Sequence, residues 1–454
     1  MNERRSAAAI DQHASELIDL ATKIWENPEI GWTEVQASGW TADYLRSQGF
    51  EVELGAYGMP TAIRAVWGHG HPVIGFCAEY DCLPGLSQKV LPYQEPVIPG
   101  GLGQGCGHNL LGVGCVGAVI GLKAELEASG KEGTIVFYGC PGEEQLIGKG
   151  LMAKNGAFTE CDFTIAWHPG TSNDSITGVC NGVEGAIFHF KGRTSHAAAN
   201  PQDGRSALDA LQLMNIGVEF LREHVTSDVR MHYMIMDGGL APNIVPDSAS
   251  SKYFVRAQSR EAVVDAFQRV LDCAEGAAKM TGTTMEVERL GGIYPTLQNK
   301  VLNDLMQQVR EELPPPEYTQ EELAFADEMN SHSPLYVKGV TPPIDSEIRP
   351  LQSKGMGGST DYGDVMYIRP GVQMTLCTAA TLSGGHSWMI TACSGSSIGM
   401  KGMLYAAKVM AEGAYRVIEH PELMDAINAD FQASTGGKPY VCPITDEVAW
   451  PYKD

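Results

Sequence analysis

Residues 133–144 read GTIVFYGCPGEE, and they decide the fold class of this chain. Residues 133–139 form a continuous apolar run, which is typical of a strand buried on both faces of a sheet. The run is followed by two adjacent carboxylates, Glu143 and Glu144. Adjacent side chains on a strand or turn point in different directions, so one carboxylate can face a metal ion while the other faces a water on that ion. Taken alone, the pair is more simply interpreted as an acidic turn in solvent.

Apolar strands and amphipathic helices alternate on both sides of this stretch. Further strands are predicted at residues 51–54, 61–67, 72–78, 163–167 and 374–378, and helices at 14–25, 34–48, 110–121 and 399–418. Strands that alternate with helices predict an α/β layered domain. Residues 314–354 are proline-rich, polar and poorly periodic, so we expect them to form a long surface excursion.

The pattern changes near Val183. Strands are predicted at 186–191, 229–236, 248–255 and 284–289, and helices at 206–223 and 260–280. This is the β-α-β-β-α-β order of a ferredoxin-like sandwich. Because the helical pattern of the first domain resumes after Asn299, we expect a discontinuous catalytic domain, residues 1–182 and 293–454, that is interrupted by an inserted domain of residues 183–292.

Composition limits the partners. The chain has 454 residues, more than one core usually supports, which favours two domains. Its net charge of -23 argues against nucleic acid or an anionic membrane as a partner. A small anionic substrate stays compatible with that charge, because an arginine or a metal can reverse the sign inside a pocket.

The same composition bears on the compartment. The eleven cysteines are an odd number without a repeating frame, and the first residues lack the apolar segment of a secretory signal. We therefore expect a cytoplasmic protein. The longest apolar segment, residues 110–122, is interrupted by glycines and too short to span a bilayer, so a buried helix packed on a sheet fits it better.

Candidate metal ligands lie where predicted strands end or loops begin, which is where open α/β sheets place their sites. They are Cys106, His108, Glu144, His168 and His386. The helix that follows Cys106 is expected to favour a thiolate there. Each residue alone is more often structural, but together they supply enough ligands for two divalent ions, and Glu143 is left as the natural general base.

These residues carry a resemblance to a known family. The segments Asp81-Cys82-Leu83-Pro84, Cys106-Gly107-His108-Asn109, Gly142-Glu143-Glu144, Trp167-His168-Pro169 and Gly192-Arg193-Thr194-Ser195-His196 resemble the M20 family of metallo-amidohydrolases. The aminoacylase/hippurate-hydrolase branch is the most similar, and within it the subgroup of p-aminobenzoyl-glutamate hydrolases of the B type. Residues 139–144, 359–365 and 440–444 carry the likeness to that subgroup.

The resemblance implies a fold and a metal site. The fold is a zinc-peptidase-like α/β/α catalytic domain with an inserted ferredoxin-like α+β dimerisation domain that acts as a lid. One or two divalent ions, Mn²⁺ or Zn²⁺ first and Co²⁺ or Ni²⁺ as alternatives, would be held by the five candidate ligands. Glu143 would be the base that activates a water, and Asp81 would orient a ligand. Many relatives outside the branch have His-x-Asp where this chain has Glu79-Tyr80-Asp81, which leaves the division of ligands between the ions open.

The inserted domain contributes three further candidates. In relatives, a histidine and an asparagine at the positions of His196 and Asn243 polarise the scissile carbonyl, often across a dimer interface, and an arginine at Arg256 grips the substrate carboxylate. The alternative for Arg256 is a surface salt bridge. Asp361 is expected to shape the substrate pocket or to buttress His386.

We therefore expect a metal-dependent amidohydrolase that cleaves N-acyl amino acids. An aromatic acyl group and glutamate or aspartate are favoured. The expected assembly is a homodimer through the inserted domain, with a higher oligomer or a heteromeric partner as alternatives. A hydrolytic deaminase of aryl amines would use the same water and release ammonia. A non-catalytic acyl-amino-acid or peptide binder is the alternative from another class, but it would have no use for Glu143.

Overall fold

The computed structural model describes residues 4–173, 178–353 and 357–452. Its larger part contains a six-stranded sheet in the order β1-β2-β4-β3-β5-β10. The strands are β1 Glu51–Leu54, β2 Ile63–His69, β3 Val73–Ala78, β4 Gly133–Gly139, β5 Phe163–Gly170 and β10 Gly371–Cys377. The last four run parallel to one another, while β1 and β2 form an antiparallel edge. Every residue of β3 is buried, as expected for a parallel strand that is covered on both faces.

Helices cover both faces of this sheet and make three layers. The helices of this domain are α1 Arg5–Gln12, α2 Ala14–Glu26, α3 Val35–Ser47, α4 His108–Ser129, α5 Gly148–Lys154, α8 Lys300–Glu312, α9 Gln320–Asn330, α10 Tyr362–Ile368, α11 Trp388–Ser394, α12 Ser397–Glu419 and α13 Glu422–Thr435. The core on one face joins the sheet to α1–α4, α8 and α12, and the core on the other face joins it to α5 and α10. The predicted α/β/α fold class is confirmed.

Helix α4 is the centre of the larger core, packed between the sheet and α12. By length and mean hydropathy it could span a membrane, but 89% of that window is buried inside the protein, as in a core helix. Its glycines permit close packing: a Cβ on Gly112 would collide with the Glu79 carbonyl oxygen, and one on Gly114 would lie 2.7 Å from the Trp167 ring. The start of α4 is thereby drawn against the ends of β3 and β5.

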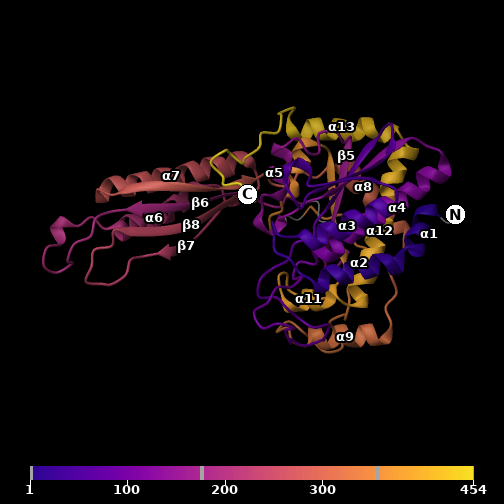
Figure 1. The fold of residues 1–454 in the computed structure, drawn as a ribbon, viewed down its shortest axis with the longest axis horizontal. Coiled ribbons are helices and arrows are strands. Elements are labelled where there is room, and N and C mark those ends of the chain that lie inside the picture. The colour runs from indigo at the N-terminus through magenta and orange to yellow at the C-terminus, as the bar shows by residue number, and fades with distance from the viewer. Residues whose placement is uncertain (1–3, 174–177, 354–356, 453–454) are drawn as a thin grey trace.

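The inserted domain contains a four-stranded antiparallel sheet in the order β7-β8-β6-β9. Its elements are β6 Gly182–Lys191, α6 Ala207–Leu221, β7 Arg230–Asp237, β8 Ser248–Ala257, α7 Arg260–Thr281 and β9 Thr284–Ile293. This is the expected β-α-β-β-α-β order. The chain leaves the catalytic domain through β6 and returns through β9, its neighbour in the sheet, and the domain extends away from the catalytic domain (Figure 1).

One prediction about the catalytic domain was wrong. Residues 314–354 were expected to form an irregular excursion, but this segment contains helix α9. The helix begins at a capping box in which Thr319 and Glu322 exchange hydrogen bonds, and it buries Ala326 and Met329. Only these two apolar residues of the helix are fully buried, so its periodicity is too weak to distinguish it from the proline-rich sequence around it.

Candidate active site

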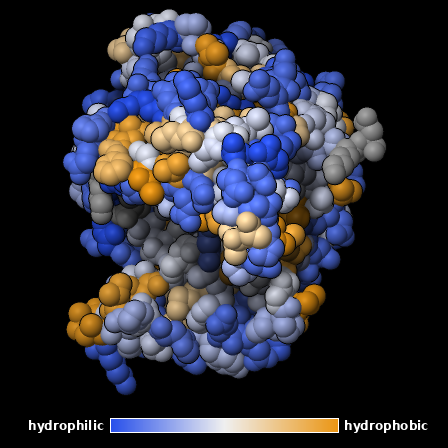
Figure 2. Space-filling view, turned by 90° about the vertical axis from the view of Figure 1, so that its left-hand side faces the viewer, coloured by the Kyte–Doolittle hydropathy of each residue, from blue (hydrophilic) through white to orange (hydrophobic). Residues whose placement is uncertain are grey.

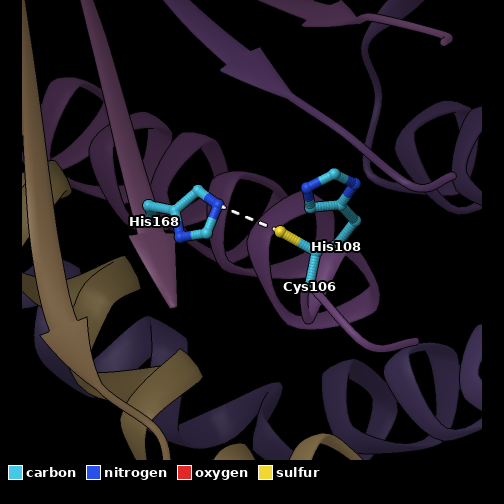
Figure 3. A group of neighbouring side chains, drawn as sticks. All are labelled: Cys106, His108 and His168. Carbon is cyan, nitrogen blue, oxygen red and sulfur yellow. Dashed lines mark hydrogen bonds between the residues drawn. The ribbon is translucent and has the colours of Figure 1, made fainter. Parts of the chain in front are cut away.

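The candidate site lies where the carboxyl ends of β3, β4 and β5 meet the start of α4. Gly107 has a φ of 81°, and a Cβ there would lie 3.1 Å from Pro169, a combination that only glycine adopts easily. This turn directs Cys106 and His108 towards the end of β5, where Cys106 Sγ lies 3.4 Å from His168 Nε2 (Figure 3). The turn sequence therefore places a thiol beside two imidazoles.

Two groups of three side chains could each hold a metal ion. Cys106, His108 and His168 form one group, and Cys106, Glu144 and His386 form the other; within each group the ligand atoms lie within 4.8 Å of one another. These groups contain all five expected ligands and share Cys106. Glu79, His108 and Glu143 form a third such group. The fold therefore brings the five candidate ligands together, although they come from segments far apart in the chain.

The residues present fit divalent ions. Among the described residues, His108 Nε2 and Glu144 Oε1 are buried and have no hydrogen-bond partner. A buried polar atom without a partner is costly, and each of these two belongs to a different one of the two groups that share Cys106. Thiolate, imidazole and carboxylate ligands together suit zinc and related transition metals.

Asp81 lies directly behind these groups. It is fully buried, its Oδ1 is 2.9 Å from His108 Nδ1, and its Oδ2 accepts a hydrogen bond of 2.9 Å from the backbone N–H of Glu144. A proton on His108 Nδ1 satisfies the first contact and leaves Nε2 free for a metal. Asp81 therefore fixes both an imidazole and the turn that carries the two glutamates, which is the position expected of a residue that orients a ligand.

Glu143 and Glu144 lie in a short 3₁₀ turn, Glu143–Gln145, between Gly142 and Leu146, which both have positive φ. Glu143 is 7% exposed and its Oε2 lies 3.9 Å from His108 Nε2. Burial, together with the nearby charges of Glu79 and Asp361, raises the pKa of Glu143 well above its ordinary value. A carboxylate with a raised pKa is a stronger proton acceptor, as a general base requires.

The expected thiolate at Cys106 is not favoured by the protein alone. Burial raises the pKa of the Cys106 thiol to about 12, although His108 acts in the opposite direction. The position before a helix is too weak to overcome this desolvation, so a bound cation would have to stabilise the thiolate. His386 differs from the other candidates because its side chain is 58% exposed, and its Nε2 lies 3.7 Å from Glu144 Oε1.

Sequence reasoning missed a buried lysine beneath the site. Lys149 is fully buried, and its Nζ donates hydrogen bonds of 2.6 Å to Glu79 Oε1 and to Asp361 Oδ1. The other Asp361 oxygen accepts from the backbone N–H of Lys149. Asp361 was expected to shape the pocket or to buttress His386; instead both its oxygens are bonded to Lys149, and the expected contact with His386 is wrong. Burial raises the pKa of Asp361 to about 6.

The site opens into a cavity of about 1030 Å³ between the two domains. Glu143, His168 and His386 line it from the catalytic domain, and Lys252, Phe254 and Arg256 line it from β8. Arg256 Nη1 donates to Ser359 Oγ at 2.8 Å, and Arg256 Nε is buried without a partner among the described residues. No carboxylate in this part of the chain pairs with Arg256, so the alternative of a surface salt bridge is not found.

His196 and Asn243 lie together, but away from this cavity. The backbone N–H of Ala197 donates to the Asn243 carbonyl at 3.0 Å, and His196 forms a β-bridge with Ile244. Both residues are exposed, in loops at the outer end of the inserted domain, and neither lines the cavity. Within one chain they cannot reach the candidate ligands, so a role at this site requires a second chain.

Comparison with known proteins agrees with this geometry. Residues 181–280 match a sequence model of the peptidase dimerisation domain. The chain is 36% identical to a p-aminobenzoyl-glutamate hydrolase of the B type from Escherichia coli, with 97% of each chain covered, and 29% identical to the Xaa-Arg dipeptidase of Mus musculus, with 95% of this chain and 92% of the relative covered. A dinuclear metal-binding M20 peptidase from Bacillus subtilis has a similar fold, with a TM-score of 0.61, 17% identity, and coverage of 90% of this chain and 99% of that one. This chain belongs to the M20 family of metal-binding hydrolases, which act on amide bonds.

Proposed function

We propose that this protein hydrolyses the amide bond of N-acyl amino acids. The observation that carries the proposal is the position of Glu143, buried beside two groups of metal ligands that share Cys106, at the wall of a cavity that also contains Arg256. Divalent ions bound by these residues would lower the pKa of a water and polarise the substrate carbonyl. A non-catalytic binder would not need a buried base at this place.

The residues of the chain divide the remaining work. A Glu143 Oε atom takes the proton of the attacking water and later delivers it to the leaving amine. Asp81 holds the His108 imidazole and the Glu144 backbone in place through its two oxygens. The Arg256 guanidinium binds the α-carboxylate of the substrate, for which its planar fork of N–H donors is suited. Zn²⁺ or Mn²⁺ is the preferred ion, with one ion for each of the two groups.

An acidic amino acid fits the cavity better than a basic one. Lys252 and Arg256 project from the same face of β8, since they are four residues apart on a strand, and both line the cavity. No carboxylate among the described residues pairs with either side chain. These two cations favour a substrate with a second carboxylate, such as an N-acyl glutamate or aspartate, and disfavour an arginine side chain.

A homodimer through the inserted domain would complete the site. Strand β7 is the edge of its sheet, and it exposes Tyr233, Met234, Ile235 and Met236 at 40%, 59%, 45% and 51%. Phe220 on α6 is 73% exposed. Viewed from the side that carries the inserted domain, the surface has several separate hydrophobic patches (Figure 2). A second copy would cover the apolar edge strand and bring His196 and Asn243 to the partner's cavity. A heteromeric partner is the alternative assembly.

The variant Glu143→Gln tests the proposal. Loaded with the same metal as the wild type, it should still bind N-benzoyl-glutamate, while kcat falls by about 10²–10⁴-fold because the base is lost. Unchanged turnover would refute the mechanism. Release of ammonia instead of glutamate would identify the protein as a deaminase, and the absence of any transition metal after purification without chelators would refute the metal site. The eleven unpaired cysteines support our further proposal of a reducing, cytoplasmic location.

A further inference from the structure

The C-terminal segment, residues 438–452, spans the junction of the two domains. Lys438 Nζ lies 3.0 Å from Glu261 Oε1 on α7 of the inserted domain, and Tyr440 donates to Asp364 Oδ1 at 2.8 Å in the catalytic domain. At its other end, the Tyr452 hydroxyl lies 2.8 Å from Thr61 Oγ1. The yellow trace of this segment runs from α13 to the base of the inserted domain and back (Figure 1). We call residues 438–452 the C-terminal strap.

The middle of the strap is anchored at the base of β9. Ile444 is 2% exposed, and its Cδ1 lies 2.7 Å from the place that a Cβ on Gly150 would occupy. At Gly291, which has a φ of 92°, the side chains of Ile147, Ile444 and Val448 converge within 3.8 Å of where a Cβ would lie. The strap therefore packs against both the inserted domain and the segment that follows the Glu143–Gln145 turn.

The end of the strap forms part of the cavity wall. Val448, Ala449 and Pro451 line the cavity, and the apolar side chains of Trp32 and Ile147 line it as well. Tyr452 holds Trp32 by an edge-to-face contact with ring centroids 5.7 Å apart. The Trp32 ring in turn packs on Gly142, the residue immediately before Glu143. This apolar wall therefore adjoins the general base.

The two sides of the cavity differ in chemistry. The inserted domain presents the cations Lys252 and Arg256, whereas the strap and its neighbours present apolar groups. A substrate amide that lies at Glu143 has its amino acid on one side and its acyl group on the other. Once the carboxylates are bound by the cations, the acyl group is directed to the apolar side.

We propose that the strap residues Val448, Ala449 and Pro451, together with Trp32 and Ile147, form the subsite that binds an aromatic acyl group. The inference rests on the proposed amidohydrolase function and adds the part of the substrate that it left open. An aromatic ring buries a large apolar area there and packs against the Trp32 ring in an offset or edge-to-face arrangement. The strap, rather than the metal-binding domain proper, then sets the acyl selectivity of the enzyme.

The variant Ala449→Trp tests this subsite, because Ala449 is exposed at the cavity wall and a larger side chain there fills the space without disturbing a core. For the metal-loaded full-length enzyme we compare N-benzoyl-glutamate with N-acetyl-glutamate. The variant should lower kcat/KM for the benzoyl substrate about tenfold, mainly through KM, and change it less than about twofold for the acetyl substrate. A thermal unfolding midpoint equal to that of the wild type would show that the variant is folded.

Asp446→Asn is the matched control. Asp446 belongs to the same strap and pairs with Lys154 in solvent, at 2.7 Å, but it does not line the cavity. It should leave both kcat/KM values unchanged. Hydrolysis of the two substrates with the same ratio in Ala449→Trp and wild type would overturn the acyl subsite alone. A wild-type enzyme that hydrolyses neither compound would overturn the proposed function and the subsite with it.

Discussion

Replacing Lys149 by methionine should destabilise the catalytic domain by about 3–5 kcal/mol at neutral to alkaline pH, the loss typical of removing one partner of a buried ion pair. Lys149 is fully buried, with its Nζ 2.6 Å from Glu79 and 2.6 Å from Asp361. Burial alone would lower the pKa of Lys149, but the two carboxylates outweigh it and raise the pKa well above its ordinary value. Methionine has a similar length and fills the space, so the change isolates the charge.

The loss should depend on pH. Burial raises the pKa of Asp361 to about 6 even with Lys149 present, above the ~3.9 of an unfolded aspartate. Without the lysine the folded pKa rises further, because the positive charge that lowered it is gone. A carboxyl whose folded pKa lies above its unfolded pKa destabilises the protein when it is charged, and this penalty disappears as pH falls through the folded pKa. The deficit of Lys149→Met should therefore be largest near pH ~8 and shrink towards pH ~5.5.

Tryptophan fluorescence during urea unfolding measures this effect in the right domain, because all seven tryptophans lie outside residues 182–293. Lys154→Met is the matched control: Lys154 lies on the same helix, α5, and its ion pair with Asp446 is exposed, so its loss should be at most about 1 kcal/mol. The double variant Lys149→Met/Asp361→Asn should recover part of the stability. A loss of the size of the Lys154→Met control, or a loss that is the same at both pH values, would refute the reasoning.

Three further perturbations address the site. Asp81→Asn should weaken metal binding about 10–100-fold, measured by competition with a chelator, because both Asp81 oxygens hold groups next to the ions; unaltered metal affinity would contradict that role. Arg256→Met should raise KM for N-benzoyl-glutamate about 10–100-fold with kcat within a few-fold, and a steady-state fit that finds kcat alone reduced would argue against carboxylate binding. His196→Ala and Glu143→Gln should each be inactive as pure dimers, whereas an equal mixture of their subunits should recover about a quarter of wild-type activity, since each mixed dimer has one intact site. No recovery on mixing would exclude a site shared between two chains.

The parts of the fold that could be predicted from sequence are those that a local pattern determines. The apolar runs at β3 and β4 are buried strands, and the glycine-rich apolar helix after Cys106 is α4, packed on the sheet through Gly112 and Gly114. Because the ligands follow the ends of parallel strands, their convergence could be expected as well. His386 was found in the same way, from a loop that follows β10.

The parts that could not be predicted depend on contacts between distant segments. Lys149, Glu79 and Asp361 come from three separate parts of the chain, and nothing in the sequence around Lys149 distinguishes it from a surface lysine. The burial of Cys106, which outweighs the helix start in setting its pKa, is likewise a property of the assembled site. A sequence pattern indicates which side chains are available, whereas the sign and size of their electrostatics depend on how deeply the fold buries them.

The interruption of the catalytic domain also determines the order in which its parts are synthesised. Helix α4, which is long and apolar enough to span a membrane, leaves the ribosome well before its main partner α12, and β5 waits for β10 until the whole inserted domain has been made. The inserted domain has its own core and can fold during this delay. The first part of the catalytic domain therefore stays uncovered the longest and is the part of the nascent chain most exposed to aggregation.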